Sequence, residues 1–184
     1  MIQLDEITKA IIAGLKEYLA AYDIKQVIEA DQPDPRPAYP FVTFKWLPMT
    51  PDGSAQPTRI VSVVPSSDER FESDVQYTYV RNPTLNLSIS VYDKARSDQI
   101  AMRAMAVRDW FEVHELGNDW LEPLNAVITN ATGIQDRDTI LDRGVERRQG
   151  FDVSIRVIDT VEVRVPTIEK VKITGPEGTK EIDL

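Results

Sequence analysis

The chain has 184 residues, 42% of them hydrophobic, so it can bury the core of one domain with appendages rather than two full domains. It contains no cysteine, which excludes disulfide bonds, thiolate catalysis and cysteine-ligated metal sites. Its formal net charge of -9 argues against a broad basic face for nucleic acid, although an acidic protein can still let DNA slide past it.

The N-terminal segment predicts an amphipathic helix from Leu4 to Tyr22, because apolar residues recur there every three or four positions. Gly14 weakens this helix by about 1 kcal/mol relative to alanine, so packing has to hold it. Charged residues interrupt the apolar run, and we therefore expect no signal peptide and no membrane span, but a soluble protein made in a cytoplasm.

The next segment alternates between strand and loop patterns. Residues 26–30 predict a short strand, and the three prolines between residues 31 and 37 predict an extended connector. Aromatic and β-branched residues in 40–46 predict a core strand. We interpret 40–46 and 59–64 as a hairpin whose long exposed tip, residues 48–57, turns at Asp52-Gly53.

The centre of the chain, residues 84–116, predicts a strand followed directly by the longest helix. Leu85, Leu87, Ile89 and Val91 alternate with small or polar residues, which is the period of a strand with one buried face. The helix is expected to begin after Asp93 as its N-cap and to stop at Gly117.

The remaining third is rich in strand patterns. Residues 125–134 and 151–157 predict strands, 136–144 a loop, and 71–80 another strand before the centre. Residues 160–174 alternate but are followed by Pro176 and Gly178, which is typical of a pendant hairpin or arm. The expected fold class is α+β: a mainly antiparallel sheet packed by an N-terminal and a long central helix. We expect one domain, 1–165, and a C-terminal extension, 166–184.

Catalytic and metal motifs are weak. The single histidine, His114, has no Gly-x-Ser-x-Gly elbow to partner it. Asp136 and Asp138 begin a calcium-loop spacing, but Leu141 stands where glycine is required and Arg147 where the bidentate glutamate belongs. We therefore expect no enzyme activity, no metal and no cofactor.

Arginines and exposed aromatics are more informative. Arginine's rigid fork suits ion pairs with carboxylates of a neighbouring subunit, although ordinary surface charge is an equally good explanation. Aromatics on several sides of a helix end indicate a covered surface, either by a partner or by a thick core. The candidate interface residues are Arg137, Arg143, Arg147, Arg148, Asp52, Gly53 and Trp120.

Several motifs in order resemble the neck or tail terminator proteins of tailed bacteriophages. They are the Tyr-Pro-Phe-Val-Thr-Phe strand at 39–44, Leu-Ser-Ile-Ser-Val-Tyr-Asp at 87–93, Arg-Asp-Trp-Phe at 108–111, and Glu-Arg-Arg-Gln-Gly-Phe-Asp-Val-Ser-Ile-Arg-Val at 146–157. The resemblance spans roughly residues 1–160. The extension from about Pro166 departs from it.

This resemblance implies a virion protein of the tail or neck, a homo-hexameric ring that caps the tail tube and joins it to the head connector. Its partners would be further copies of itself, the tail tube protein, the connector or adaptor protein, and the tail sheath as a further candidate. DNA would pass through the ring without sequence-specific binding. The alternatives are a head-completion or adaptor protein of the neck, or a small-molecule-binding α/β module.

Overall fold

The computed structural model describes residues 2–33, 35–51, 56–69, 71–94, 96–141, 144–167, 170–176 and 178–183. These residues form two compact units. The larger unit comprises residues 2–53 and 82–158, and the smaller unit comprises residues 54–81 and 159–184. The boundary at residue 165 that we expected from the sequence stays a prediction.

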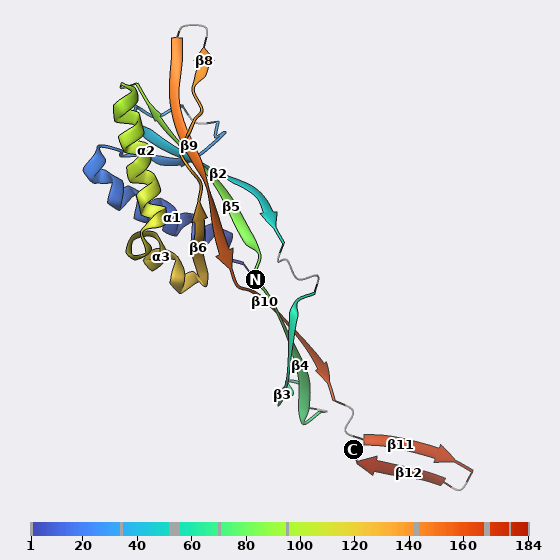
Figure 1. Ribbon diagram of the computed structural model, residues 1–184. Helices are drawn as coiled ribbons and strands as arrows, with labels where there is room; N and C mark the ends of the chain where they lie inside the picture. The colour runs from blue at the N-terminus through green and yellow to red at the C-terminus, as the bar shows by residue number, and fades with distance from the viewer. Residues whose placement is uncertain are drawn as a thin grey trace. The chain divides into compact units, whose positions relative to one another are not determined.

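The larger unit is a β-sheet with helices on one face (Figure 1). Its sheet runs in the order β1-β2-β5-β9-β6, with β7 and β8 paired to β9, and every strand pair is antiparallel except β1 with β2. The fold class is therefore α+β, as predicted. The strands are β1 (Val27–Glu29), β2 (Phe41–Thr50), β5 (Thr84–Asp93), β6 (Ala126–Ala131), β7 (Gln135–Asp136), β8 (Thr139–Leu141) and β9 (Gly144–Val157).

The helices of this unit are α1 (Leu4–Leu19), α2 (Ser97–Glu112) and α3 (His114–Leu121), with single 3-10 turns η1 (Ala20–Tyr22) and η2 (Glu122–Leu124). The predicted N-terminal helix is confirmed as α1 over Leu4–Leu19, and the last three predicted residues form the 3-10 turn η1. Within the described ranges, every helix is too short or too polar to cross a membrane.

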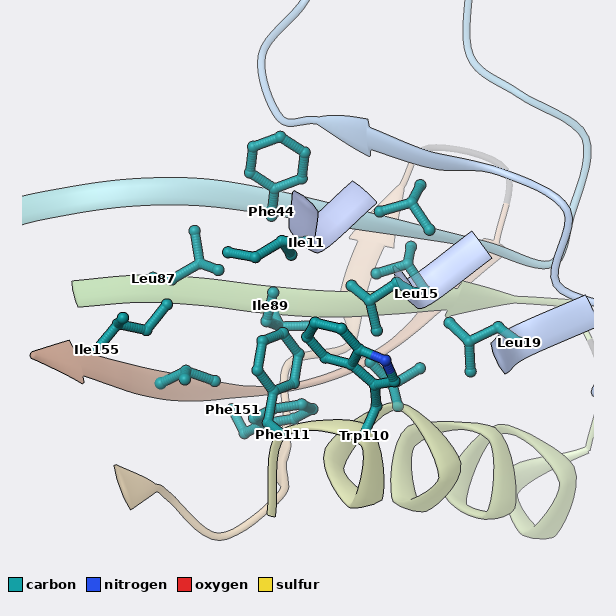
Figure 2. Close-up of a cluster of buried hydrophobic side chains, with 14 of the residues drawn as sticks. Ile11, Leu15, Leu19, Phe44, Leu87, Ile89, Trp110, Phe111, Phe151 and Ile155 are labelled. Carbon is teal, nitrogen blue, oxygen red and sulfur yellow. The ribbon is translucent and has the colours of Figure 1, made fainter. Parts of the chain in front are cut away.

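The core lies between the helices and the inner face of β5 and its neighbours. The four alternating apolar residues of β5 are at most 3% exposed, as the period-2 pattern requires. Trp110 and Phe111 of α2 point into this space, which Leu15 of α1 enters from the other side (Figure 2). The ring of Phe111 meets that of Phe151 edge-on with centroids 6.0 Å apart. Aromatic and aliphatic groups from three helices and five strands thus share one interior.

Gly14 has a packing role that explains why this residue stands in a helix. A Cβ at Gly14 would lie 2.6 Å from Cζ2 of Trp110 and 3.1 Å from Cδ1 of Trp120. Both distances are shorter than ordinary carbon contacts, so glycine lets α1 approach two tryptophans from α2 and α3. The close packing of α1 on Trp110 and Trp120 compensates for the lower helix propensity of glycine.

The smaller unit is built from strands in its described residues. β3 (Thr58–Pro65), β4 (Ser73–Arg81) and β10 (Asp159–Pro166) form a three-stranded antiparallel sheet with β4 in the middle. β11 (Lys170–Gly175) and β12 (Gly178–Asp183) pair as a separate two-stranded hairpin. The segment 160–174, for which we predicted a pendant hairpin or an arm, is divided between them: its first part is β10 in the three-stranded sheet, and its last part is the first strand of the β11–β12 hairpin.

One predicted pairing is wrong. β2 does not form a hairpin with β3, but pairs with β1 and β5, while β3 pairs with β4 in the smaller unit. The physical reason is the apolar pattern: β2 has a buried face that matches the inner face of β5, whereas β3 is exposed at nearly every position. Two strand patterns joined by a loop of about ten residues need not be partners.

The predicted ends of the central helix are also wrong. Asp93 is not an N-cap but the last residue of β5, where it is 5% exposed and its carboxylate accepts a hydrogen bond from Arg103. α2 ends at Glu112, because the backbone of Val113 is extended. It is 16 residues long, the same length as α1. Gly117 lies inside α3, where a Cβ would be 2.6 Å from the carbonyl oxygen of Trp110. Glycine serves close packing there rather than helix termination.

We predict that Gly14→Ala destabilises the chain by about 1–3 kcal/mol, because the new methyl group overpacks against Trp110. Helix propensity alone predicts the opposite, a gain of about 1 kcal/mol. Urea unfolding followed by circular dichroism decides between them. A more stable Gly14→Ala variant would contradict the packing described above.

Candidate functional site

The outer face of the main sheet, opposite the helices, carries a connected set of polar and aromatic side chains. Cross-strand register places them in three rows, each with one residue from β2, one from β5 and one from β9. We call this set the polar face. Its rows are Phe41, Tyr92 and Arg148; Thr43, Ser90 and Gly150; and Lys45, Ser88 and Asp152.

Arg137 lies across the middle of the polar face. It follows β7, and its guanidinium donates to Oγ of Ser88 at 2.9 Å and to Oδ1 of Asp152 at 3.1 Å. Gly150 makes room for it, since a Cβ there would lie 2.8 Å from Nη1 of Arg137 and 2.4 Å from the carbonyl oxygen of Ile89. The absence of a side chain at Gly150 is thus what allows Arg137 to bridge β5 and β9.

Asp152 is held in its charged form by these neighbours. Partial burial by itself would raise the pKa of this carboxyl, but hydrogen bonds from Ser88 and Arg137 and the positive charge of Arg137 together lower the pKa below its ordinary value. The Ser88 hydroxyl donates to the same oxygen at 2.6 Å. The carboxylate therefore fixes both side chains in place.

Arg148 forms the second arginine position of the polar face. Its guanidinium carbon stands 5.3 Å from the ring centroid of Tyr92, and its Nη2 donates to Oγ of Ser90 at 2.9 Å. Tyr92 in turn stacks on Phe41 with centroids 4.8 Å apart and ring planes 6° from parallel. The Nε of Arg148 is buried without a hydrogen-bond partner in the described residues, so part of its donor capacity is unused.

A third group joins the start of β9 to the segment before β2. The Tyr39 hydroxyl donates to Oε1 of Glu146 at 2.6 Å, and Arg36 pairs with the same carboxylate. Burial and the bond to Glu146 raise the pKa of Tyr39, while the bond from Arg36 opposes this. The cluster ties segments more than 100 residues apart in sequence.

An open hollow of about 450 Å³ borders the polar face. Parts of segments 26–32 and 35–37 line it, together with Phe41, Thr43 and Tyr92. A small-molecule function would require such a hollow to present convergent reactive groups. Among the described residues, no group of three histidine, aspartate or glutamate side chains could hold a metal ion.

The structure brings together two of the predicted interface residues, Arg137 and Arg148. Arg147 stands opposite Asp93 in the β5–β9 register, and strand alternation places it on the other face from Arg148. Trp120 is 38% exposed on α3 and packs over Gly14. The other three predicted residues, Arg143, Asp52 and Gly53, lie outside the described residues. Their role as interface residues stays a prediction.

Sequence reasoning missed the aromatic and acidic members of this surface. Tyr92, Ser88 and Ser90 alternate with the buried apolar residues of β5. The same alternation that located the core therefore already placed these three side chains on the outer face. The contribution of Tyr39 and Glu146 depends on a contact between distant segments, which one sequence does not reveal.

We predict that Arg137→Gln raises the pKa of Asp152 toward its ordinary value of 3.8. Because the folded-state pKa is lowered, the stabilising contribution is present above the ordinary value and disappears as the pH falls through the folded-state value. The variant should therefore lose up to about 1 kcal/mol at neutral pH, a small amount because solvent screens a half-exposed pair, and nothing in strong acid.

Carboxyl chemical shifts in an NMR titration measure this pKa directly. Arg147→Gln is the matched control, because it removes the same charge from the opposite face of β9 and should leave the Asp152 titration unchanged. An unchanged pKa in Arg137→Gln would contradict the contact.

A family model described as phage neck terminator protein matches residues 4–180 of the chain. No curated protein matches the chain significantly.

Proposed function

The chain belongs to the phage neck terminator protein family, and from this membership we propose that six copies form a ring that caps the tail tube and joins the tail to the head connector. Membership makes the protein a structural component of the phage virion, located in the neck or tail and interacting with tail and head components. The ring, its stoichiometry and its individual partners are our proposal.

The observation that carries the proposal is the family match over nearly the whole chain, and the one-sided core supports it. The helices cover one face of the main sheet, and the polar face lies on the other, where Lys45 is exposed while Phe41, Thr43 and Ser90 are at most 8% exposed. Ion pairs and hydrogen bonds between arginines and carboxylates hold the side chains of that face in place. This suits a subunit that must present the same surface at every position of a ring. A ring subunit needs no catalytic group, in keeping with a structural family.

The proposed partners are further copies of the chain, the tail tube protein and the connector, with the sheath as a further candidate. We assign contacts with tube or connector to the segment 48–57 and the arm 166–184. The chain would be made in the host cytoplasm before it joins the particle. DNA would pass through the ring, and the net charge of -9 favours an acidic lumen that repels phosphate.

We predict that the purified chain, mixed with tail tubes, forms six-membered rings at one end of each tube. Electron microscopy with rotational averaging measures the subunit number. Twelve-membered rings bound to head connectors instead of tubes would contradict the proposal and identify an adaptor protein. A chain that remains solitary in the presence of tubes would contradict any ring function.

We also predict that a chain truncated after Thr167 keeps the main sheet but loses head-to-tail joining. Among the described residues, β11 and β12 pair with one another and with no other strand, so removal of the hairpin should leave the unfolding transition of the larger unit unchanged. Complementation of a phage lacking this gene, scored by joined particles in electron micrographs, measures the effect. Normal joining by the truncated chain would refute the role of the arm.

A further inference from the structure

Two neighbouring strands carry the chain from one unit into the other. β4 leads into β5 between residues 81 and 82, and β9 leads into β10 between residues 158 and 159. Arg81 stands opposite Asp159 in the small sheet, and Thr84 stands opposite Arg156 in the main sheet. Each strand has two residues between these pairs, so both ladders share one register. We call residues 81–84 and 156–159 the connecting ribbon.

No third strand accompanies the middle of the connecting ribbon in the part of the chain that the structure describes. β2 pairs with β5 only as far as Thr84, and β3 pairs with β4 only from Val80 onward. On the other side, β6 pairs with β9 as far as Val157, and β10 has β4 as its one neighbour. Two strands by themselves twist more than a wider sheet and are marginally stable.

The hydrogen bonds across the connecting ribbon are incomplete. The N–H of Val157 donates to the carbonyl oxygen of Pro83 at 3.1 Å, but proline has no N–H with which to return the bond. The N–H of Ile158 donates to the carbonyl oxygen of Asn125 at 3.1 Å. The larger unit thus holds the ribbon at Pro83 and Ile158, while the ladder of the small sheet begins at Arg81 and Asp159. Asn82 and the peptide link 158–159 lie between these two sets of bonds.

The side chains at this point allow the backbone to turn without separating the strands. Asn82 is exposed and Ile158 is 51% exposed, so a change of backbone torsion there uncovers little buried surface. Arg81 donates to the carboxylate of the buried Asp159 at 2.6 Å. This ion pair joins the two strands where they enter the small sheet.

We propose that Asn82 and the link 158–159 form a hinge, about which the smaller unit turns relative to the larger one until the chain joins the particle. A stiff continuation of the main sheet requires a third strand and a complete ladder through this point, and the connecting ribbon has neither. Hinges of this kind are a few residues at the ends of elements that absorb changes in backbone torsion. A hinge lets one unit find its binding position after the other has docked on tail or head components. The hinge is a property of the free chain and does not rest on the proposed ring.

The test measures distances between spin labels in the two units. The chain has no cysteine, so two introduced cysteines are the only labelled positions. Met102→Cys on α2 and Val63→Cys on β3 place one label in each unit, at side chains that are both 70% exposed. The control pair, Met102→Cys with Lys9→Cys on α1, lies within the larger unit. Pulsed electron paramagnetic resonance should give a distance distribution at least about twice as wide for the first pair as for the control, and a narrow one after assembly on tail tubes.

Pro83→Val tests the hinge residue by residue. Valine supplies the missing N–H to the ladder and favours a strand, so the distance distribution between the units should narrow, by roughly half. Pro65→Val is the matched control, because Pro65 ends β3 inside the small sheet and its replacement should leave the distribution unchanged. Circular dichroism verifies that both variants keep their fold.

A distribution in the free natural chain as narrow as that of the control pair would overturn the hinge. So would an unchanged width in Pro83→Val, or a distribution that stays wide on tail tubes. Failure of the natural chain to assemble on tubes would instead defeat the proposed function, while a wide distribution in the free chain would still support the hinge.

Discussion

The structure depends on the burial of one side of β5. Its alternating apolar residues meet α1 and α2 on the inner face, and the intervening residues form the middle of the polar face. Because a strand presents successive side chains to opposite faces, a single ten-residue stretch defines both the core and the outer surface. β2 and β9 pair with this strand, and the remaining strands of the larger unit pair with one of these two.

The two units differ in how far their apolar residues are buried. The larger unit has a complete hydrophobic interior, with large aromatic groups almost inaccessible to water. The smaller unit has a sheet with apolar residues but no second layer in its described residues. A structural protein of the phage neck interacts with partners. One unit with a complete core and one unit with a single-layer sheet are consistent with that place in the virion.

Local patterns predicted much of this fold. The apolar stripe of α1 predicted the helix, and the alternation in β5 and from Phe151 onward predicted the two central strands. Together these patterns predicted the fold class. The pairing of β3 could not be predicted, because its exposed residues carry no information about a buried partner. From the sequence, Gly14 was expected to weaken the N-terminal helix and Gly117 to end the central helix. Their packing role is visible only when the tryptophan that each contacts is in place.

The candidate site was predicted less well, for a related reason. The arginines of 137–148 were recognisable as a cluster in sequence, but strand alternation separates Arg147 from Arg148, and only the gap at Gly150 explains how Arg137 reaches Asp152. The small sheet joins β3 and β4, which follow one another in sequence, to β10, which is distant from both. Alternation was legible in β4 and in β10, yet a shared face exists only once β3, β4 and β10 are aligned.

Hydrogen–deuterium exchange of the chain, free in solution and assembled on tail tubes, tests most directly the claim that the core is complete and the small sheet is not. We expect amides of β5 and β9 to be protected equally in both states, and amides of β3, β4 and β10 to gain strong protection only on assembly. Equal protection of the small sheet in both states, or protection of β5 that appears only on assembly, would contradict this account.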